Sequence, residues 1–373
     1  MSKYFEKFSS KKANILLVGS GGVGTIASLG LEKGGFAQVT SVLRSDYEKV
    51  SKHGFEIKSI DHGDYTNWKP HRIVPNVQAA VDAGEVYDYI VVAIKALPEF
   101  FKTEEIIRPA MVKNAAGEYP TVVLIQNGID IERPVYEAYP GAIVLSGVSM
   151  IGSHNFGGKI VQFEHDVISF GYYPDCVSET NTEEKLEDRT HEFVALYAAS
   201  GVNATYHPQL MLARWRKLVY NSCINTVCAI TQLDTGRAYL SGVDNALTLP
   251  AMYEILKIAK AAGYELPEEL PQGMIDSDSG VFYEPSMMID VKKGNPIELE
   301  VILGNPLRIA KRLGVEAPIL TVLYNLLKGV QFRLLENKGG ILNVPEKAPR
   351  VGDSRIDHPS FPSEFPAKKP EPL

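Results

Sequence analysis

The sequence predicts an α/β protein: a parallel-sheet domain at the amino terminus, then a mostly α-helical domain. Apolar strand-like runs alternate with helical patterns up to about residue 207, and helical periodicity alone follows. The chain has 373 residues, more than a single hydrophobic core usually serves. We therefore expect a first domain over residues 1–207, a second over 208–340, and an irregular proline-rich tail over 341–373.

Composition narrows the class of protein. Hydrophobic residues make up 45% and charged residues 22%, which is typical of globular proteins, and the net charge of −7 disfavours nucleic acid as a partner. The three cysteines lack the spacing of a metal site or a disulfide framework, which suits a reducing compartment. No run reaches the roughly 18 apolar residues that cross a bilayer, and no signal sequence precedes the first strand. We expect a cytoplasmic protein without a bound metal or a membrane partner.

The first element is a strand, a glycine turn and a helix. The apolar run 14–18 leads directly into the turn, and a helical pattern follows. Glycines allow a tight turn, let the backbone approach a pyrophosphate and let the helix pack close to the strand, while helix N–H groups face the anion. This order predicts a Rossmann-type dinucleotide-binding domain. Its cofactor-binding turn is Gly19, Ser20, Gly21, Gly22, Val23 and Gly24.

The end of the second strand, 38–43, is where such domains distinguish a ribose 2′-hydroxyl from a 2′-phosphate. An NAD site has Asp or Glu there. This chain has Arg44 and Ser45, and a guanidinium can fork onto phosphate oxygens. We therefore favour NADP(H). Asp46 keeps NAD as the alternative, and an ordinary surface arginine is the structural alternative.

Two later strands end in polar residues. Strand 88–94 ends at Lys95, and strand 121–125 runs into Gln126, Asn127 and a glycine. Open α/β sheets bind ligands beyond the carboxyl ends of their strands. Lys95 is therefore a candidate cofactor ligand and Asn127 a candidate for cofactor and substrate. A surface lysine and a turn-forming Asn-Gly are the alternatives.

The remaining segments have weaker signals. Residues 53–75 predict a β excursion before the sheet resumes at 88, and residues 142–147 predict another strand. Two extended runs, 158–164 and 166–170, predict a hairpin. The polar segment 175–191 predicts a loop that enters a helix ending near residue 200, with a last strand at 202–206. The helices of the second domain are expected at 209–233, 235–241, 244–263, 280–292, 296–314 and 318–336.

The most informative helix carries Lys217, Asn221 and Asn225. These residues recur every four positions in an otherwise apolar run, so they share one face of a helix that is buried on nearly all sides. An ammonium without a partner is costly to bury, so Lys217 should pair with a carboxylate or face a polar cavity. A purely structural ion pair is the alternative.

A second polar cluster follows in the helical domain. Ser286 opens a segment that includes Asp290, and Pro296 is expected to start the next helix with Glu298 in its first turn. The helix dipole favours a carboxylate there, which explains Glu298 without any catalytic role. Glu298 is also a natural partner for Lys217.

Together and in order, these motifs resemble those of the ketopantoate reductases (2-dehydropantoate 2-reductases) over residues 13–336. Six matches carry the resemblance: the glycine turn with Arg44 closing the second strand, Lys95, Asn127 in Gln-Asn-Gly, Lys217-x3-Asn221-x3-Asn225, Ser286-Met-x-x-Asp290, and Glu298 twelve residues after that serine.

The resemblance implies NADPH-dependent reduction of 2-dehydropantoate to (R)-pantoate, in pantothenate and coenzyme A biosynthesis. It implies that Lys217 protonates the 2-keto oxygen and that Glu298 positions Lys217. It further implies that Asn127 bridges cofactor and substrate, while Asn221, Asn225 and Ser286 hold the substrate. The chemistry is reasonable, because an ammonium stabilises a nearby alkoxide and then neutralises it by proton transfer.

Two other functions stay open. One is a D-2-hydroxyacid dehydrogenase on the same scaffold, acting on another branched 2-keto acid. The other is a non-catalytic, NADP-binding redox sensor, which would need the glycine turn but no proton donor. The amino-terminal extension, the 175–191 insertion and the tail make this chain longer than compact bacterial relatives. The helical domain also offers a surface for a homodimer.

Overall fold

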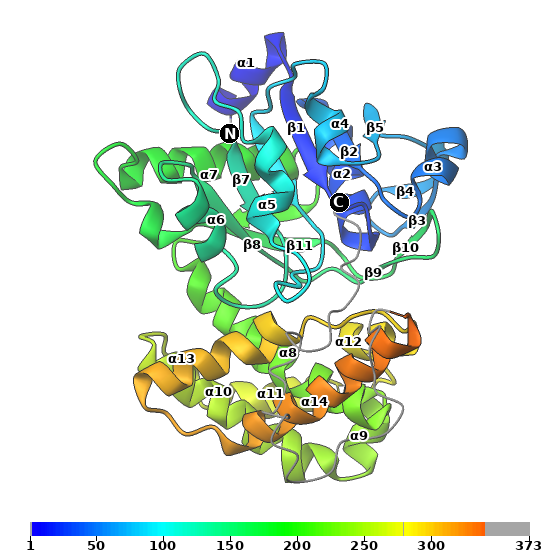
Figure 1. The fold of residues 1–373 in the computed structure, drawn as a ribbon, viewed down its shortest axis with the longest axis vertical. Helices are drawn as coiled ribbons and strands as arrows, with labels where there is room; N and C mark the ends of the chain where they lie inside the picture. Colours follow the sequence, from blue (N-terminus) through cyan, green and yellow to red (C-terminus); the bar gives the residue numbers. More distant parts are fainter. Residues whose placement is uncertain (1, 279, 340–373) are drawn as a thin grey trace, which may run out of the picture.

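The fold consists of a sheet domain joined to a helical domain (Figure 1). The computed structural model describes residues 2–278 and 280–339, so the proline-rich tail expected over 341–373 lies outside the described residues. The main sheet has eight strands in the order β12-β11-β8-β7-β6-β1-β2-β5. Its strands are β1 (Ala13–Val18), β2 (Ala37–Val42), β5 (Arg72–Val74), β6 (Tyr89–Val92), β7 (Thr121–Leu124), β8 (Val144–Ser149), β11 (Val167–Tyr172) and β12 (Asn203–Tyr206).

The main sheet is largely parallel, as predicted. Six neighbouring strands run parallel, in the sheet order β5, β2, β1, β6, β7 and β8. The next strand, β11, is antiparallel to β8. Strands β6 and β7 are buried at every position, as expected for strands covered on both faces. The flanking helices are α1 (Ser2–Ser10), α2 (Gly22–Lys33), α3 (Tyr47–His53), α4 (Val77–Val81), α5 (Thr103–Ile107), α6 (Arg133–Ala138) and α7 (Glu183–Ala198), with short 3-10 turns at Arg108–Ala110 and Pro174–Cys176.

The strand order reverses between β1 and β6. From β1 the chain goes to β2 on one side and later returns to β6 on the other. Ligands of open α/β sheets bind beyond the carboxyl ends of the strands at such a point. The glycine turn follows β1 and Lys95 follows β6, so both lie at this edge.

A second sheet of four strands corrects the hairpin predicted from 158–164 and 166–170. It comprises β4 (Gly63–Trp68), β3 (Phe55–Ser59), β10 (Lys159–Gln162) and β9 (Ser153–Asn155), in that order. Strand β10 pairs with β9 and β3, whereas β11 joins the main sheet. Gly157 and Gly158 have positive φ angles, which makes the tight turn fall before β10 instead of after it. The β excursion expected over 53–75 is confirmed for β3 and β4, whereas β5 already belongs to the main sheet.

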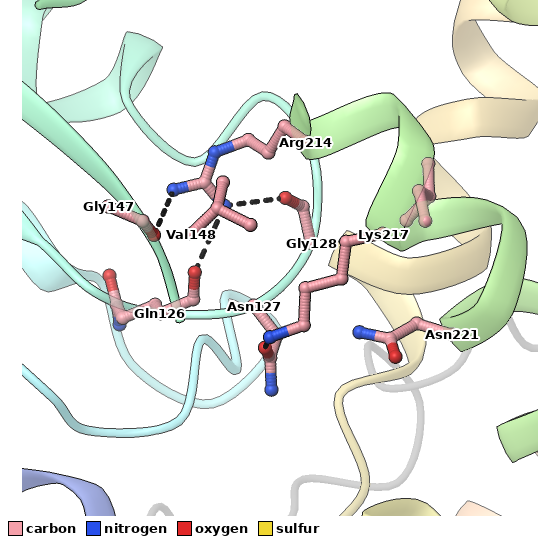
Figure 2. Close-up of a pocket in the computed structure, with 9 residues that line it drawn as sticks. Gln126, Asn127, Gly128, Gly147, Val148, Arg214, Lys217 and Asn221 are labelled. Carbon is pink, nitrogen blue, oxygen red and sulfur yellow. Dashed lines mark hydrogen bonds between the residues drawn. The ribbon is translucent and has the colours of Figure 1, made fainter. Parts of the chain in front are cut away.

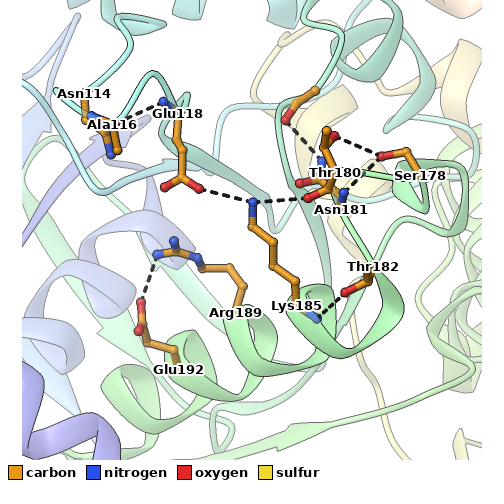
Figure 3. A network of polar contacts seen from close by, with 11 residues as sticks. Asn114, Ala116, Glu118, Ser178, Thr180, Asn181, Thr182, Lys185, Arg189 and Glu192 are labelled. Atoms are coloured by element: carbon orange, nitrogen blue, oxygen red, sulfur yellow. Dashed lines mark hydrogen bonds and ion pairs between the residues drawn. The ribbon is translucent and has the colours of Figure 1, made fainter.

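The polar segment 175–191 is only half loop, because α7 begins at Glu183. The side chain of Thr182 accepts a hydrogen bond from the backbone of Lys185 at 3.3 Å, and acidic residues occupy the first turn. Both features stabilise a helix start in a polar sequence. The Lys185 ammonium also pairs with Glu118 at 3.1 Å, which holds this segment against the turn around residue 116 (Figure 3).

The helical domain surrounds α8 (Leu210–Thr231), which also reaches the sheet domain at β8 (Figure 1). Its other helices are α9 (Thr235–Leu240), α10 (Leu249–Ala261), α11 (Leu270–Asp278), α12 (Ser286–Lys292), α13 (Asn305–Leu313) and α14 (Pro318–Asn337), with π-helical turns at Asp244–Thr248 and Glu300–Gly304. Among the described residues, no helix is long and apolar enough to cross a membrane.

Three helix predictions in this domain need correction. Helix α11 was not predicted, because Pro271 and Gly273 obscure its pattern. The helix expected from residue 280 begins only at Ser286. The helix expected from Pro296 begins after Glu298, since the Gln331 side chain bonds both the N–H and the C=O of Ile297 and replaces the helical hydrogen bonds there.

Candidate active site

The glycine turn has the shape of a cradle for an anionic group. Gly19 has a φ of +105°, and a Cβ there would lie 2.6 Å from Ile94. A Cβ at Gly24 would lie 1.8 Å from the Gly19 carbonyl oxygen, so α2 can approach β1 only with glycine at this position. At Gly21, by contrast, a Cβ would meet nothing within 4 Å. The open face at Gly21, just before α2, therefore fits the pyrophosphate of a dinucleotide, whereas Gly22 packs against the Ser153 carbonyl of β9.

Arg44 and Ser45 are exposed directly beyond β2. Among the described residues, the Arg44 guanidinium has no hydrogen-bond or ion-pair partner. Asp46, at the start of α3, instead accepts a 2.8 Å hydrogen bond from Asn155 of β9. The cation at this edge of the sheet is thus available to a ligand, whereas the neighbouring carboxylate is engaged.

Helix α8 places the Lys217 ammonium against the sheet domain. The Nζ atom donates to Asn127 Oδ1 at 2.8 Å and to the Ser149 carbonyl at 2.5 Å. Figure 2 shows Lys217 and Asn127 pointing toward one another, with the Asn221 amide alongside. Lys217 as a whole is partly exposed, but its ammonium is buried. Burial, with a smaller contribution from the Arg214 charge, lowers the pKa of Lys217 to about 8.

Glu298 reaches Lys217 through Asn127, and not by the direct pairing expected from the sequence. The Asn127 Nδ2 atom donates to Glu298 Oε2 at 3.3 Å, while its Oδ1 atom accepts from Lys217. The other oxygen, Glu298 Oε1, accepts from the Ala96 backbone N–H at 3.0 Å. The Glu298 charge still opposes the fall in the pKa of Lys217. The carboxylate therefore orients Asn127 and acts on the ammonium at a distance.

Lys95 is engaged across the domain boundary. Its ammonium forms an ion pair with Asp290 of α12. Burial raises the pKa of Asp290 to about 6, outweighing the opposite effect of Lys95. The predicted cofactor ligand is therefore also a contact between the two domains.

Asn221, Asn225 and Ser286 form a polar patch beside Lys217. The Asn225 Nδ2 atom lies 3.2 Å from Asn221 Oδ1 and 3.4 Å from Ser286 Oγ. The Asn225 Oδ1 atom is buried and has no partner among the described residues. A buried acceptor without a donor is costly, so this oxygen is suited to a ligand hydroxyl.

Sequence reasoning missed Arg214, which lies one turn before Lys217 and is 3% exposed. Its Nη1 atom donates to the carbonyls of Gln126 at 3.0 Å and Gly128 at 2.9 Å, on either side of Asn127 (Figure 2). Its Nε atom pairs with the buried Glu132 at 2.8 Å. Arg214 thus fixes the loop that presents Asn127. Arg214 lies three residues before Lys217 in the same largely apolar helix, and this spacing was the signal available in the sequence.

Comparisons with known proteins agree with this architecture. The family model "Ketopantoate reductase PanE/ApbA" matches residues 15–175, and "Ketopantoate reductase PanE/ApbA C terminal" matches residues 209–331. An uncharacterized protein of Saccharomyces cerevisiae is 38% identical, and the match covers 91% of this chain and 99% of that protein. A 2-dehydropantoate 2-reductase of a Nostoc species is 30% identical over 88% of this chain and 97% of its own length.

Solved structures show the same fold. The 2-dehydropantoate 2-reductase from Methylococcus capsulatus superposes with a TM-score of 0.73 at 31% identity, over 86% of this chain and 97% of that one. A D-mandelate dehydrogenase solved with NADH and anilino(oxo)acetate has a TM-score of 0.74 at 19% identity, over 86% and 99% of the chains, which shows a shared fold. The family models and the full-length relatives together establish that the chain belongs to the ketopantoate reductase (2-dehydropantoate 2-reductase) family.

Proposed function

We propose that this chain is an NADPH-dependent reductase that converts 2-dehydropantoate to (R)-pantoate, a step in pantothenate and coenzyme A biosynthesis. The observation that carries the proposal is the Lys217 ammonium. It lies at a polar pocket between the domains, its pKa is about 8, and Asn127 orients it. Family membership and the glycine cradle support the same conclusion.

The residues that would hold the cofactor lie at the carboxyl edge of the sheet. The open face at Gly21, the residue before α2, would take the pyrophosphate, and Arg44, which has no partner among the described residues, would take a 2′-phosphate. Lys95 and Asn127 would complete the cofactor side of the cleft. When bound, the reduced nicotinamide supplies a hydride to the substrate's keto carbon.

Lys217 supplies the other half of the reaction. As the keto carbon gains a hydride, its oxygen becomes an alkoxide and takes a proton from Lys217 Nζ, which solvent then reprotonates. An ammonium whose pKa is about 8 is mostly protonated at neutral pH and gives up its proton more readily than an ordinary lysine. Asn221, Asn225 and Ser286 would bind the substrate's carboxylate and hydroxyl, and the Asn225 oxygen, which lacks a partner among the described residues, would accept the hydroxyl hydrogen bond.

The test is initial-rate oxidation of NADPH and NADH by the purified protein, with ketopantoate, 2-ketoisovalerate and phenylglyoxylate as substrates. Rapid turnover of ketopantoate with NADPH supports the proposal. Preference for another keto acid would retain the Lys217 chemistry but make the protein a D-2-hydroxyacid dehydrogenase. No turnover of any of the three substrates would favour a non-catalytic NADP-binding sensor.

A paired substitution tests the role of Lys217. Lys217→Ala should lower kcat by roughly 10²-fold or more, because general acid catalysis contributes on this scale, while NADPH still binds. Arg216→Ala is the matched control, since this neighbouring cation on α8 is exposed. Near-normal turnover in Lys217→Ala would refute the assignment.

A further inference from the structure

The end of β9 contacts both segments of the candidate nucleotide site through one side chain, Asn155. Its Nδ2 atom donates to the Ser20 carbonyl at 3.2 Å, inside the glycine turn, and to Asp46 Oδ2 at 2.8 Å, just beyond β2. Its Oδ1 atom accepts from the Gly158 backbone N–H at 2.8 Å. One carboxamide thus connects the pyrophosphate cradle with the segment that meets the ribose.

The chemistry of the partners fixes the orientation of this amide. A backbone carbonyl and a carboxylate only accept hydrogen bonds, so both must face the Asn155 amino group, and the Gly158 N–H must face its oxygen. The turn between β9 and β10 is itself held in place, because the Lys49 ammonium of α3 donates to the Gly157 carbonyl. The Asn155 amino group therefore points at Asp46 from an anchored position.

The engagement of Asp46 has a consequence for Arg44. A carboxylate two residues from an arginine can pair with it, repel a phosphate or accept a ribose hydroxyl, and the last of these is the role of an acidic residue in NAD sites. Here Asp46 is bound to Asn155, and the Arg44 guanidinium has no partner within the described parts of the chain.

We propose that Asn155 is a specificity-determining residue for the cofactor: by restraining the Asp46 carboxylate it leaves Arg44 unpaired and favours a 2′-phosphorylated dinucleotide. This inference rests on the proposed use of NADPH. The inference adds a determinant of cofactor specificity that lies on the β9–β10 hairpin of the four-stranded sheet, outside the segment that follows β2. It also explains how the chain carries an acidic residue so close to a site that would bind a phosphate.

The test measures binding without any keto acid present. Dissociation constants for NADP⁺ and NAD⁺ are determined by isothermal titration calorimetry for the wild type, Asn155→Ala and Asn155→Asp. We expect Asn155→Ala to weaken NADP⁺ binding roughly tenfold, the scale of one charge-assisted hydrogen bond, and NAD⁺ binding by less than about twofold. Asn155→Asp should weaken NADP⁺ binding further, because its carboxylate would face two acceptors and the phosphate.

A double-mutant cycle separates this role from a structural one. If Asn155 acts through Asp46, adding Asn155→Ala to an Asp46→Ala protein should leave the NADP⁺/NAD⁺ ratio unchanged. Lys159→Ala is the matched control on the same hairpin, because Lys159 pairs with the exposed Glu56 at 3.2 Å and contacts neither Ser20 nor Asp46 in the described part of the chain. Thermal unfolding of each variant checks that the fold is retained.

The outcomes distinguish this inference from the proposed function. Equal loss of both nucleotides in Asn155→Ala, or an effect that persists without Asp46, would overturn the inference and leave an NADPH reductase intact. A wild type that binds NAD⁺ better than NADP⁺ would overturn both the cofactor assignment and the inference. A selective loss that disappears in the Asp46→Ala background supports both.

Discussion

Replacing Arg214 by methionine should destabilise the protein strongly. Arg214 is 3% exposed and its partner Glu132 is fully buried, with the two charges 2.8 Å apart. Met fills most of the space but leaves the Glu132 carboxylate without its counter-charge and the carbonyls of Gln126 and Gly128 without donors. Removing one member of a buried ion pair costs about 3–5 kcal/mol, so we expect the free energy of unfolding to fall by this amount.

Urea unfolding followed by circular dichroism measures the effect. Lys185→Met is the matched control, because its partner Glu118 is partly exposed and the pair is worth about 1 kcal/mol or less (Figure 3). Combining Arg214→Met with Glu132→Met removes both charges and should recover much of the loss. The reasoning is refuted if Arg214→Met is no worse than the control, or if the double variant is no more stable than the single one.

The remaining predictions concern the Lys217 proton and the cofactor. If Lys217 is the proton donor, as proposed, its pKa of about 8 should keep kcat for keto acid reduction level below that pH and make kcat fall about tenfold per pH unit above it, with the opposite trend for alcohol oxidation. The Glu298 charge raises the pKa of Lys217, so Glu298→Gln should move the alkaline fall in kcat to lower pH. The Arg214 charge lowers the same pKa, so Arg214→Met should move that fall to higher pH. Shifts of both variants in the same direction would contradict these electrostatic roles. Arg44→Ala should raise KM for NADPH far more than KM for NADH. Equal effects on the two KM values would mean that Arg44 is a surface arginine without a role in recognising the 2′-phosphate.

Local patterns in the sequence predicted the parts of the site that depend on local periodicity. The four-residue spacing of Lys217, Asn221 and Asn225 placed three side chains on one face of α8. The carboxyl ends of β6 and β7 placed Lys95 and Asn127 at one edge, because parallel strands share their direction. In each case the residues that come together are a few positions apart in one helix, or lie at the ends of two adjacent strands.

The missed features depend on contacts between distant segments. Asn155 meets Asp46 across 109 positions of the chain, and β10 pairs in parallel with β3 across a similar distance. Gln331 of α14 bonds Ile297, and the helix expected to start at Pro296 therefore begins only after Glu298. No local periodicity or propensity encodes such pairings. A sequence pattern can therefore indicate which residues are candidates for the site, but it does not show which distant residues they contact.

Asn127 explains why the site requires both domains in one arrangement. Its amide can serve Lys217 and Glu298 together only in one orientation, with oxygen toward the ammonium and nitrogen toward the carboxylate. Asn127 belongs to the sheet domain, whereas both partners belong to the helical domain, and Arg214 holds the loop on either side of it. A rotation of one domain would break these contacts at once and leave the Lys217 ammonium undirected. The geometry that orients the proposed proton donor is therefore the same geometry that holds the domains together.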